Sequence, residues 1–412
     1  MKAVRQYLDF FRSERQRLEA GSLPLLNAQR EAAAAALERL QFPSQKVERY
    51  KYTDVEAAFA PNYGIELTPQ KPADTTEKHS LEPEKHSPAT VSPSHPEALS
   101  HYATLADVNA DAITALNTML VQNVTVIYAA PGERKEHPVQ ITRTLQATAP
   151  LMQNRRLLIV AEAGAELTVI LTDKAVAGQD FLATQVTEVF VGEGAHVELY
   201  DIEDTQERCH RFHQVFAQVT AGGHLTHGVF TLAGGVSRNQ TDIRLTGEGA
   251  AVQLLGCAVL GGTQHADNNT LIDHLAPGCT SHELYKYVVD QQATGAFAGR
   301  VLVREGAVQT DSVERNANLV CTSQARMWTQ PMLEIYADDV KCSHGSTVGQ
   351  LNDDALFYMR QRGISETEAR TLLKQAFASE VLNEIPHEAL RQRLHVLVEK
   401  RFRSCENCQL CK

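Results

Sequence analysis

Between residues 123 and 348 the chain alternates short apolar runs with turns. Runs such as VTVIYAA, HVELYDIED and GRVLVREGAVQTDSV have the composition and spacing of β-strands. A glycine followed by a small or polar residue and then a strand recurs at intervals of 30, 28, 27, 29 and 28 residues, at Gly164, Gly194, Gly222, Gly249, Gly278 and Gly306. This steady period, without helical segments between the strands, predicts a parallel β-helix whose coils stack and share a core. A sandwich or barrel would explain the strands and turns but not the constant interval.

The N-terminal residues have helical spacing. Apolar residues recur on one face before and after the sequence GSLP, at Tyr7, Phe10, Phe11, Leu18, Leu25, Leu26 and Leu40. Two antiparallel helices are therefore predicted over residues 2–40.

Helical signals return after the last strand. Asn352 is suited to cap a helix that ends at Gly363, and Ser365 with Glu368 forms a capping box for the next helix. A third helix is expected over residues 387–403. We expect this small helical unit to close the solenoid and to offer a docking face.

A polar segment separates the N-terminal helices from the strands. Residues 68–100 are rich in Pro, Ser, Thr, Lys, Glu and His, which is typical of an insertion or linker. We expect solvated histidines here rather than metal ligands, at His79, His86, His95 and His101. The predicted organisation is an N-terminal helical region, a polar insertion, a β-helix core, a C-terminal helical domain and a Cys-rich tail, over residues 1–67, 68–105, 106–350, 351–403 and 404–412.

Charge and composition exclude several classes of partner. The 412 residues include 50 acidic and 39 basic side chains, a formal charge of −11, which disfavours binding to nucleic acid or to anionic membranes. No apolar run has the length of a signal peptide or of a membrane span. We therefore expect a cytoplasmic protein whose 8 cysteines are free thiols, buried residues or metal ligands rather than disulfides.

The stretch LEIYADDVKCSHGSTVGQ contains the strongest candidate site. On a strand, Cys342 and His344 point to the same side, about 6.6 Å apart along the chain. A closed soft-metal site needs four ligands, so the remaining ligands would be Asp338, Asp339 or groups from another subunit. A Cys-His catalytic dyad is disfavoured because the two side chains project in parallel. A buried cysteine beside a surface histidine remains the alternative without a site.

Other cysteines and histidines form weaker patterns. His210 and His213 beside Cys209 face opposite sides of a strand, as do His224 and His227, so surface or core positions are expected. Single cysteines in apolar contexts are expected to be buried: Cys257, Cys279 and Cys321. The tail differs because its Cys-x-x-Cys-x-x-Cys spacing suits a transient soft metal or cluster, or else a reactive tail without a ligand, at Cys405, Cys408 and Cys411.

Four stretches together resemble the SufB/SufD family of iron–sulfur cluster assembly proteins, and most of all its SufD branch. They are ERYKYTD, RNANLV, PMLEIYADDVKCSHGSTVGQLNDDALFYMRQRGIS and AFASEVLNEI, at residues 48–54, 315–320, 331–365 and 376–385. The polar insertion and the three-cysteine tail depart from the family pattern.

The resemblance implies a right-handed parallel β-helix between helical ends, which pairs with SufB through its core and binds the SufC ATPase through its C-terminal helices. It also implies that His344, with Cys342 beside it, contributes to an iron or iron–sulfur cluster site shared with SufB. A reduced flavin is associated with such complexes, although no dinucleotide-binding fingerprint is visible here. The chain itself is expected to be a scaffold and not an enzyme, because the ATPase activity belongs to SufC.

Two other functions are weighed against this one. A SufB-like homodimeric scaffold would carry sulfur or a cluster on its own thiol and would need no separate SufB. A β-helix carbohydrate-processing enzyme is disfavoured, since the chain shows neither an export signal nor a recognisable catalytic set.

Overall fold

The computed structural model of the chain describes residues 2–65, 67, 96–146, 148–175 and 178–406. The predicted histidines His79, His86 and His95 lie outside these residues. His101 lies inside them and packs against Phe190, with ring centroids 4.3 Å apart.

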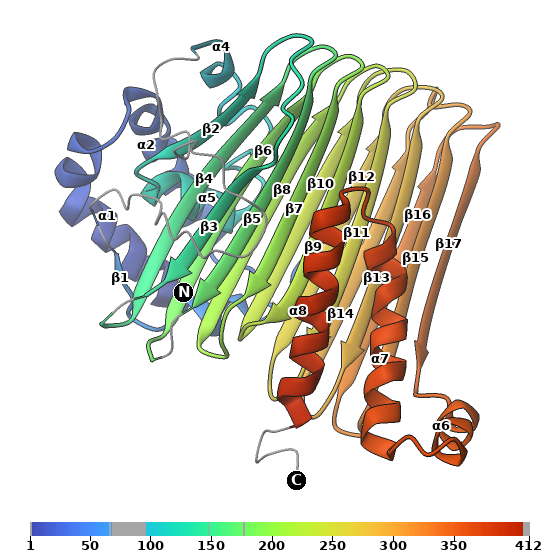
Figure 1. Cartoon of the computed structure of the whole chain (residues 1–412). Coiled ribbons are helices and arrows are strands. Elements are labelled where there is room, and N and C mark those ends of the chain that lie inside the picture. Colours follow the sequence, from blue (N-terminus) through green and yellow to red (C-terminus); the bar gives the residue numbers. More distant parts are fainter. Residues whose placement is uncertain (1, 66, 68–95, 147, 176–177, 407–412) are drawn as a thin grey trace.

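A parallel β-solenoid forms the centre of the molecule (Figure 1). The strands run in chain order as β1 (Gly64–Ile65), β2 (Val124–Ala129), β3 (Val139–Leu145), β4 (Leu151–Ala161), β5 (Glu166–Ala175), β6 (Phe181–Val191), β7 (His196–Asp204), β8 (Cys209–Val219), β9 (His224–Ala233), β10 (Val236–Leu245), β11 (Ala251–Leu260), β12 (His265–His274), β13 (Thr280–Val289), β14 (Thr294–Val303), β15 (Asp311–Val320), β16 (Arg326–Ile335) and β17 (Lys341–Gly349).

Successive strands alternate between two sheets. One sheet has nine strands in the order β1-β4-β6-β8-β10-β12-β14-β16, with β2 also beside β4, and the other has eight in the order β17-β15-β13-β11-β9-β7-β5-β3. Neighbours within a sheet are parallel, as in the pairing of β13 with β15, and belong to consecutive coils. The predicted β-helix core between helical ends is therefore confirmed, and the alternative sandwich or barrel is wrong.

The glycine period has a conformational origin. The six repeat glycines all have positive φ, between 60° and 86°, a region that residues with a Cβ rarely occupy. Their amides also connect the coils: the Gly164 amide donates to the Glu193 carbonyl at 2.8 Å, and the Gly194 amide to the Ala221 carbonyl at 2.9 Å. Each coil therefore repeats the same turn directly above the previous one.

Alternation along the strands places apolar side chains from both sheets inside the solenoid. The interior cluster includes Leu157, Ile159, Val169, Val189, Leu199, Val215, Leu225, Ile243, Leu254 and Ile272. A single coil could not bury these side chains by itself, so the coils must stack to form the core.

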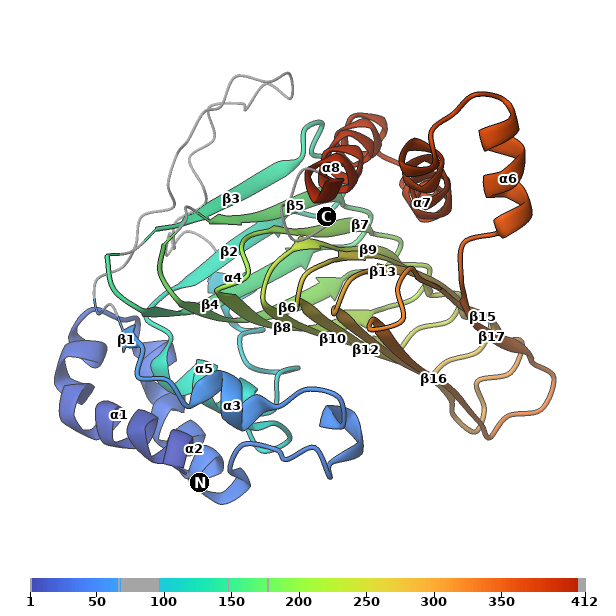
Figure 2. The same ribbon diagram turned by 90° about the horizontal axis from the view of Figure 1, so that it is seen from below.

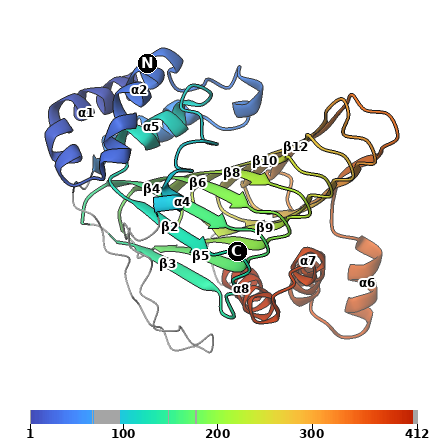
Figure 3. The ribbon, with the colours of Figure 1, turned by 90° about the horizontal axis from the view of Figure 1, so that it is seen from above.

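The N-terminal helices lie on the outer face of the nine-stranded sheet (Figures 2 and 3). They are α1 (Lys2–Ala20), α2 (Pro24–Leu40), the 3₁₀ turn η1 (Glu48–Tyr50), α3 (Val55–Phe59), α4 (Pro96–Leu99) and α5 (Ala112–Leu120). Buried Arg30 joins α2 to the end of α5 by donating to the carbonyls of Met119 and Val121, both at 2.7 Å. The two predicted helices are present, whereas α5 was not predicted.

The C-terminal helices are α6 (Asp353–Gln361), α7 (Glu366–Asn383) and α8 (Glu388–Glu406). The predicted caps are present: Asn352 Oδ1 accepts from the Ala355 amide at 3.0 Å, and Ser365 Oγ accepts from the Glu368 amide at 3.2 Å. Helices α7 and α8 pack on the outer face of the eight-stranded sheet, opposite the N-terminal helices (Figure 2). The expectation that they close the end of the solenoid is wrong, because their apolar faces cover the outward side chains of the sheet.

Candidate functional site

The last coil of the solenoid carries the predicted site. We define the terminal coil as β16, β17 and the loop between them, residues 326–349. Strand β17 pairs with β15 on one side only, and β16 is the final strand of the nine-stranded sheet. In the part of the chain that the structure describes, two parallel edges therefore present unpaired backbone groups, which are the groups that pair with another chain.

Cys342 and His344 lie on β17, opposite Ser312 and Glu314 of β15. Ser346 has the same parity, and its hydroxyl lies 2.6 Å from the Thr329 hydroxyl on β16. The three alternate residues of β17 therefore face the interior side of the coil.

Cys342 is half-buried in a small apolar cluster with Val301 and Val303. Burial, followed by the nearby Asp311 carboxylate, raises the pKa of the Cys342 thiol. A nucleophilic cysteine needs a lowered pKa, so the local electrostatics disfavour the catalytic interpretation. They are compatible both with a buried thiol that has no ligand and with a thiol that loses its proton on binding a metal.

His344 is exposed, and within the described part of the chain its ring forms no hydrogen bond or ion pair. Asp338 and Asp339 are also exposed in the loop before β17, where Asp339 has a φ of 52°. Among the described residues, no three His, Cys, Asp or Glu side chains are close enough to hold a metal ion. The terminal coil thus presents an imidazole and a thiol without a closed ligand set.

Apolar side chains surround this open end. Ile335, Tyr336 and Val348 are 41%, 64% and 52% exposed. A second apolar group lies on α6, where Phe357 and Tyr358 are 64% and 60% exposed. Figure 2 shows α6 standing away from the solenoid at the β17 end.

The other predicted residues occupy different places. Cys209, Cys257 and Cys279 are buried and Cys321 is half-buried, as free thiols. The side chain of Cys405 and all of Cys408 and Cys411 lie outside the described residues.

The predicted histidines divide between core and surface. His213 and His227 are buried inside the solenoid, whereas His210 is half-buried and accepts from the Val236 amide at 3.2 Å. His224 stacks on His196 with ring centroids 4.7 Å apart.

Sequence reasoning missed a charged network inside the solenoid. Arg155 binds Asp173 with nitrogen–oxygen distances of 2.7 and 2.8 Å, and Arg211 bridges Asp173 to Asp201. Burial would raise the pKa of Asp201, but contacts with Arg211 and His213 outweigh burial and hold this pKa far below its usual range. Only the register between coils brings these residues together.

The ERYKYTD segment is a clamp on the outer face of the nine-stranded sheet. Arg49 pairs with Asp242 and donates to Asn269 Oδ1 at 2.9 Å, and Thr53 donates to Asp267 Oδ2 at 2.6 Å. Tyr52 stacks on Trp328 of β16. The segment therefore spans the solenoid from β10 to the terminal coil.

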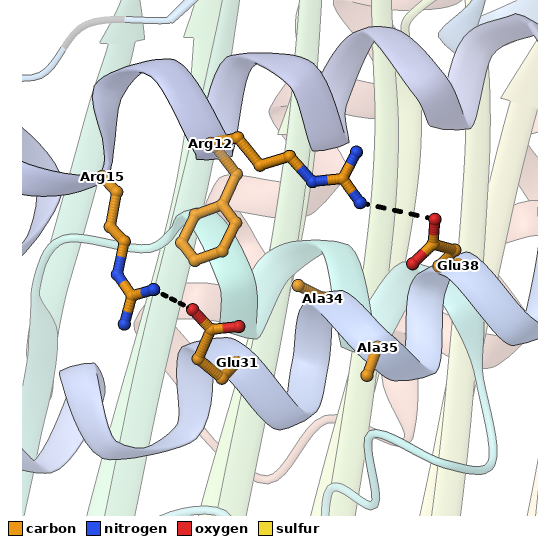
Figure 4. Close-up of a pocket in the computed structure, with 7 residues that line it drawn as sticks. Arg12, Arg15, Glu31, Ala34, Ala35 and Glu38 are labelled. Atoms are coloured by element: carbon orange, nitrogen blue, oxygen red, sulfur yellow. Dashed lines mark hydrogen bonds and ion pairs between the residues drawn. The ribbon is translucent and has the colours of Figure 1, made fainter.

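A shallow hollow of about 230 Å³ lies between α1 and α2 (Figure 4). Its charged lining is paired, with Arg12 bound to Glu38 at 3.4 Å and Arg15 bound to Glu31. It contains no free nucleophile or unpaired charge among the described residues, so we do not assign it a site.

None of the described helices combines the length and apolar character needed to cross a membrane. The fold and the terminal coil together define a β-solenoid scaffold with open strand edges and an incomplete ligand set.

Comparison with known proteins identifies the family. Residues 143–377 match the SufBD core domain of the SUF system for FeS cluster assembly, and residues 1–81 and 85–141 match the SufBD protein N-terminal region. The chain belongs to the SufBD family of iron–sulfur cluster assembly proteins.

Individual relatives agree with this placement. The chain is 32% identical to the iron–sulfur cluster assembly protein SufD of Escherichia coli over 305 residues, which cover 72% of this chain and 70% of that protein. It is 30% identical to a SufBD family protein of Synechocystis sp. over 324 residues, which cover 76% and 69%. A chloroplastic protein of Arabidopsis thaliana, ABCI7, is 26% identical over 294 residues, covering 68% and 61%.

Proposed function

We propose that this chain is a SufD-like scaffold subunit of a cytoplasmic iron–sulfur cluster assembly complex, not itself an enzyme. Family membership and the likeness to a SufD protein support the general role. The observation that carries the particular role is the exposed imidazole of His344, without a partner among the described residues, on an open terminal coil.

In this proposal, the terminal coil pairs with SufB. Its two strand edges offer backbone hydrogen bonds, and the exposed side chains of Tyr336 and Val348 offer apolar contact area. His344 and Cys342 supply half of an iron or cluster site, whose remaining ligands come from SufB. The iron and sulfide are cargo of the complex, and no residue of this chain is assigned to a flavin.

The C-terminal helices are proposed to bind the SufC ATPase. The exposed aromatic pair on α6, Phe357 and Tyr358, supports this because exposed aromatic residues dominate the energetics of protein interfaces. Helix α7 lies beside α6 and is fixed to the eight-stranded sheet by packing and by ion pairs such as Lys374 with Asp290, at 2.6 Å.

The test is to co-express the chain with SufB and SufC, purify the complex and measure iron and acid-labile sulfide. His344→Ala should leave the composition of the complex unchanged, because the side chain is exposed, and should abolish cluster content. Cys342→Ser should cause a smaller loss, since oxygen is a poorer ligand for soft metals.

His282→Ala is the matched control, because His282 is an exposed histidine of the same sheet. It should retain normal cluster content. Normal cluster content in an intact His344→Ala complex would overturn the assignment of His344. Recovery of a stable homodimer that assembles clusters without SufB would favour the SufB-like alternative.

A further inference from the structure

Two carboxylates inside the solenoid have no hydrogen-bond or ion-pair partner among the described residues. Glu283 of β13 and Glu314 of β15 are directly opposite in register and are 3% and 1% exposed. Neighbouring strands are about 4.8 Å apart, so the two side chains project side by side into the interior. Within the described chain, all four carboxylate oxygens lack a hydrogen-bond partner.

Each of the other buried carboxylates of the described chain has at least one hydrogen bond or ion pair. Asp173 binds Arg155, and Glu188 binds Arg156 at 2.8 Å and the Ala103 amide at 2.8 Å. Hydrogen bonds or ion pairs likewise engage Asp111, Asp201, Glu203, Asp267 and Asp273. Since an unpaired buried charge is costly, the exception at Glu283 and Glu314 needs a specific explanation, such as a bound ion.

No basic side chain of the described residues influences either carboxylate. Burial raises the pKa of Glu283 to about 7, opposed only by the Thr270 hydroxyl. Burial and the neighbouring Glu283 raise the pKa of Glu314 to about 9. Both shifts favour proton binding by the pair, as expected for two adjacent buried carboxylates with no positive charge beside them.

The surroundings are shaped to receive these groups. Gly299 on the opposite sheet leaves room for the Glu314 carboxylate, because a Cβ at this position would collide with Oε1. The Thr270 hydroxyl, from the same opposite sheet, belongs to a residue that is 2% exposed, and it has no hydrogen-bond partner in the described chain. It adds an oxygen donor beside Glu283.

The row of side chains that contains Glu283 and Glu314 extends to the open end of the solenoid. Glu283, Glu314 and His344 lie opposite one another on the consecutive neighbours β13, β15 and β17. His344 is exposed at the open end, so it stands between solvent and the carboxylate pair.

We propose that Glu283 and Glu314 bind one divalent cation of the Fe²⁺ or Mn²⁺ type inside the solenoid, entering past His344. A charge of +2 compensates both carboxylates, and carboxylate, hydroxyl and water oxygens are the ligands that such ions accept. Two protein carboxylates without a third strong ligand make a site that exchanges its ion. The site does not depend on any partner subunit or on the role proposed for His344 in cluster assembly.

The test uses the isolated full chain and Mn²⁺, whose free concentration is followed by electron paramagnetic resonance. Mn²⁺ is chosen because thiolates prefer softer ions, so the cysteines do not compete. The Glu283→Gln, Glu314→Gln double variant should bind the ion at least about tenfold more weakly than the parent. Mutation of residues that only support metal ligands already lowers affinity by about tenfold or more. Glutamine resembles the protonated acid, so the fold should survive, as checked by circular dichroism.

Glu248→Gln with Glu305→Gln is the control, because it removes two exposed carboxylates in turns of the solenoid and should leave Mn²⁺ binding unchanged. Gly299→Ala provides a second variant that keeps both glutamates but displaces the Glu314 carboxylate, and it should weaken binding as well. Equal binding by the parent and the double variant, or no binding by the folded parent, would overturn the proposal.

Discussion

Tyr52 and Trp328 stack with ring planes 16° apart and centroids 5.1 Å apart, which ties the N-terminal clamp to the terminal coil. Tyr52→Ala should lower the free energy of unfolding by about 1–2 kcal/mol, since aromatic pairs contribute roughly 0.5–1.5 kcal/mol beyond the area they bury. Chemical denaturation of the isolated chain measures this. Tyr336→Ala removes a 64% exposed ring and should change stability little, and equal losses in both variants would contradict the clamp.

The repeat glycines should be sensitive to a single methyl group. Gly194 has a φ of 62°, and no atom lies within 4 Å of the place that a Cβ would occupy, so Gly194→Ala tests backbone strain alone. We expect a loss of about 1–2 kcal/mol in unfolding free energy, the cost of a left-handed residue with a side chain. Gly349→Ala is matched for open space but lacks positive φ, and should be nearly neutral. Equal stability of the two variants would refute the strain argument.

Buried His227 should make the protein sensitive to acid. Burial lowers the pKa of His227 to about 4, while its Nδ1 lies 3.1 Å from the Leu199 carbonyl. The unfolded chain binds a proton near pH 6.5 and the folded chain only near pH 4, so stability is complete above about pH 6.5 and falls as pH decreases through this window.

The expected loss from this residue is on the order of 3 kcal/mol, at about 1.36 kcal/mol per pH unit. Urea denaturation at pH 7 and pH 4.5 should show a smaller decrease for His227→Gln than for the parent. His282→Gln, at an exposed position, should behave as the parent does. If His227→Gln lost as much stability between pH 7 and pH 4.5 as the parent, groups other than His227 would govern the acid sensitivity.

The two proposed docking surfaces should be separable. Phe357→Ser with Tyr358→Ser should reduce capture of SufC and spare SufB, because both rings lie on α6, outside the packed core. Tyr336→Ser with Val348→Ser should do the reverse, since these side chains surround the terminal coil. Each variant is the control for the other in a quantitative pull-down. Loss of both partners from either variant would contradict two separate surfaces.

Some features of this protein follow from local sequence. The glycine period predicted the solenoid because each turn needs a residue at positive φ, as at Gly164 and Gly278. The caps at Asn352 and Ser365 were predicted because a capping side chain binds an amide only three residues away. These signals are short in range, so no tertiary information is needed to recognise them.

The unpredicted helix α5 marks the limit of such patterns. Asp111 caps it, with its side chain accepting from the Ile113 and Thr114 amides, but all nine of its residues are buried. Its polar residues Thr114, Asn117 and Thr118 do lie at helical spacing, but they form hydrogen bonds with buried groups of the nine-stranded sheet and do not face solvent. A helix of nine residues without a solvated face is easily taken for part of a strand-rich region. The position of the C-terminal helices was misjudged for a related reason: an apolar helix face does not specify which surface it covers.

The amino-acid sequence alone determined the repeating turn, the capped helices and the common face of Cys342 and His344, because alternation along one strand is a local property. Only the tertiary structure decided that Glu283, Glu314 and His344 stand in one row, and that Arg211 reaches Asp201. The residues in that row are about 30 positions apart in the chain, and their register depends on the exact length of every turn between them. A one-residue change in a coil would turn a whole strand over, so these contacts are properties of the stacked coils and not of any one segment.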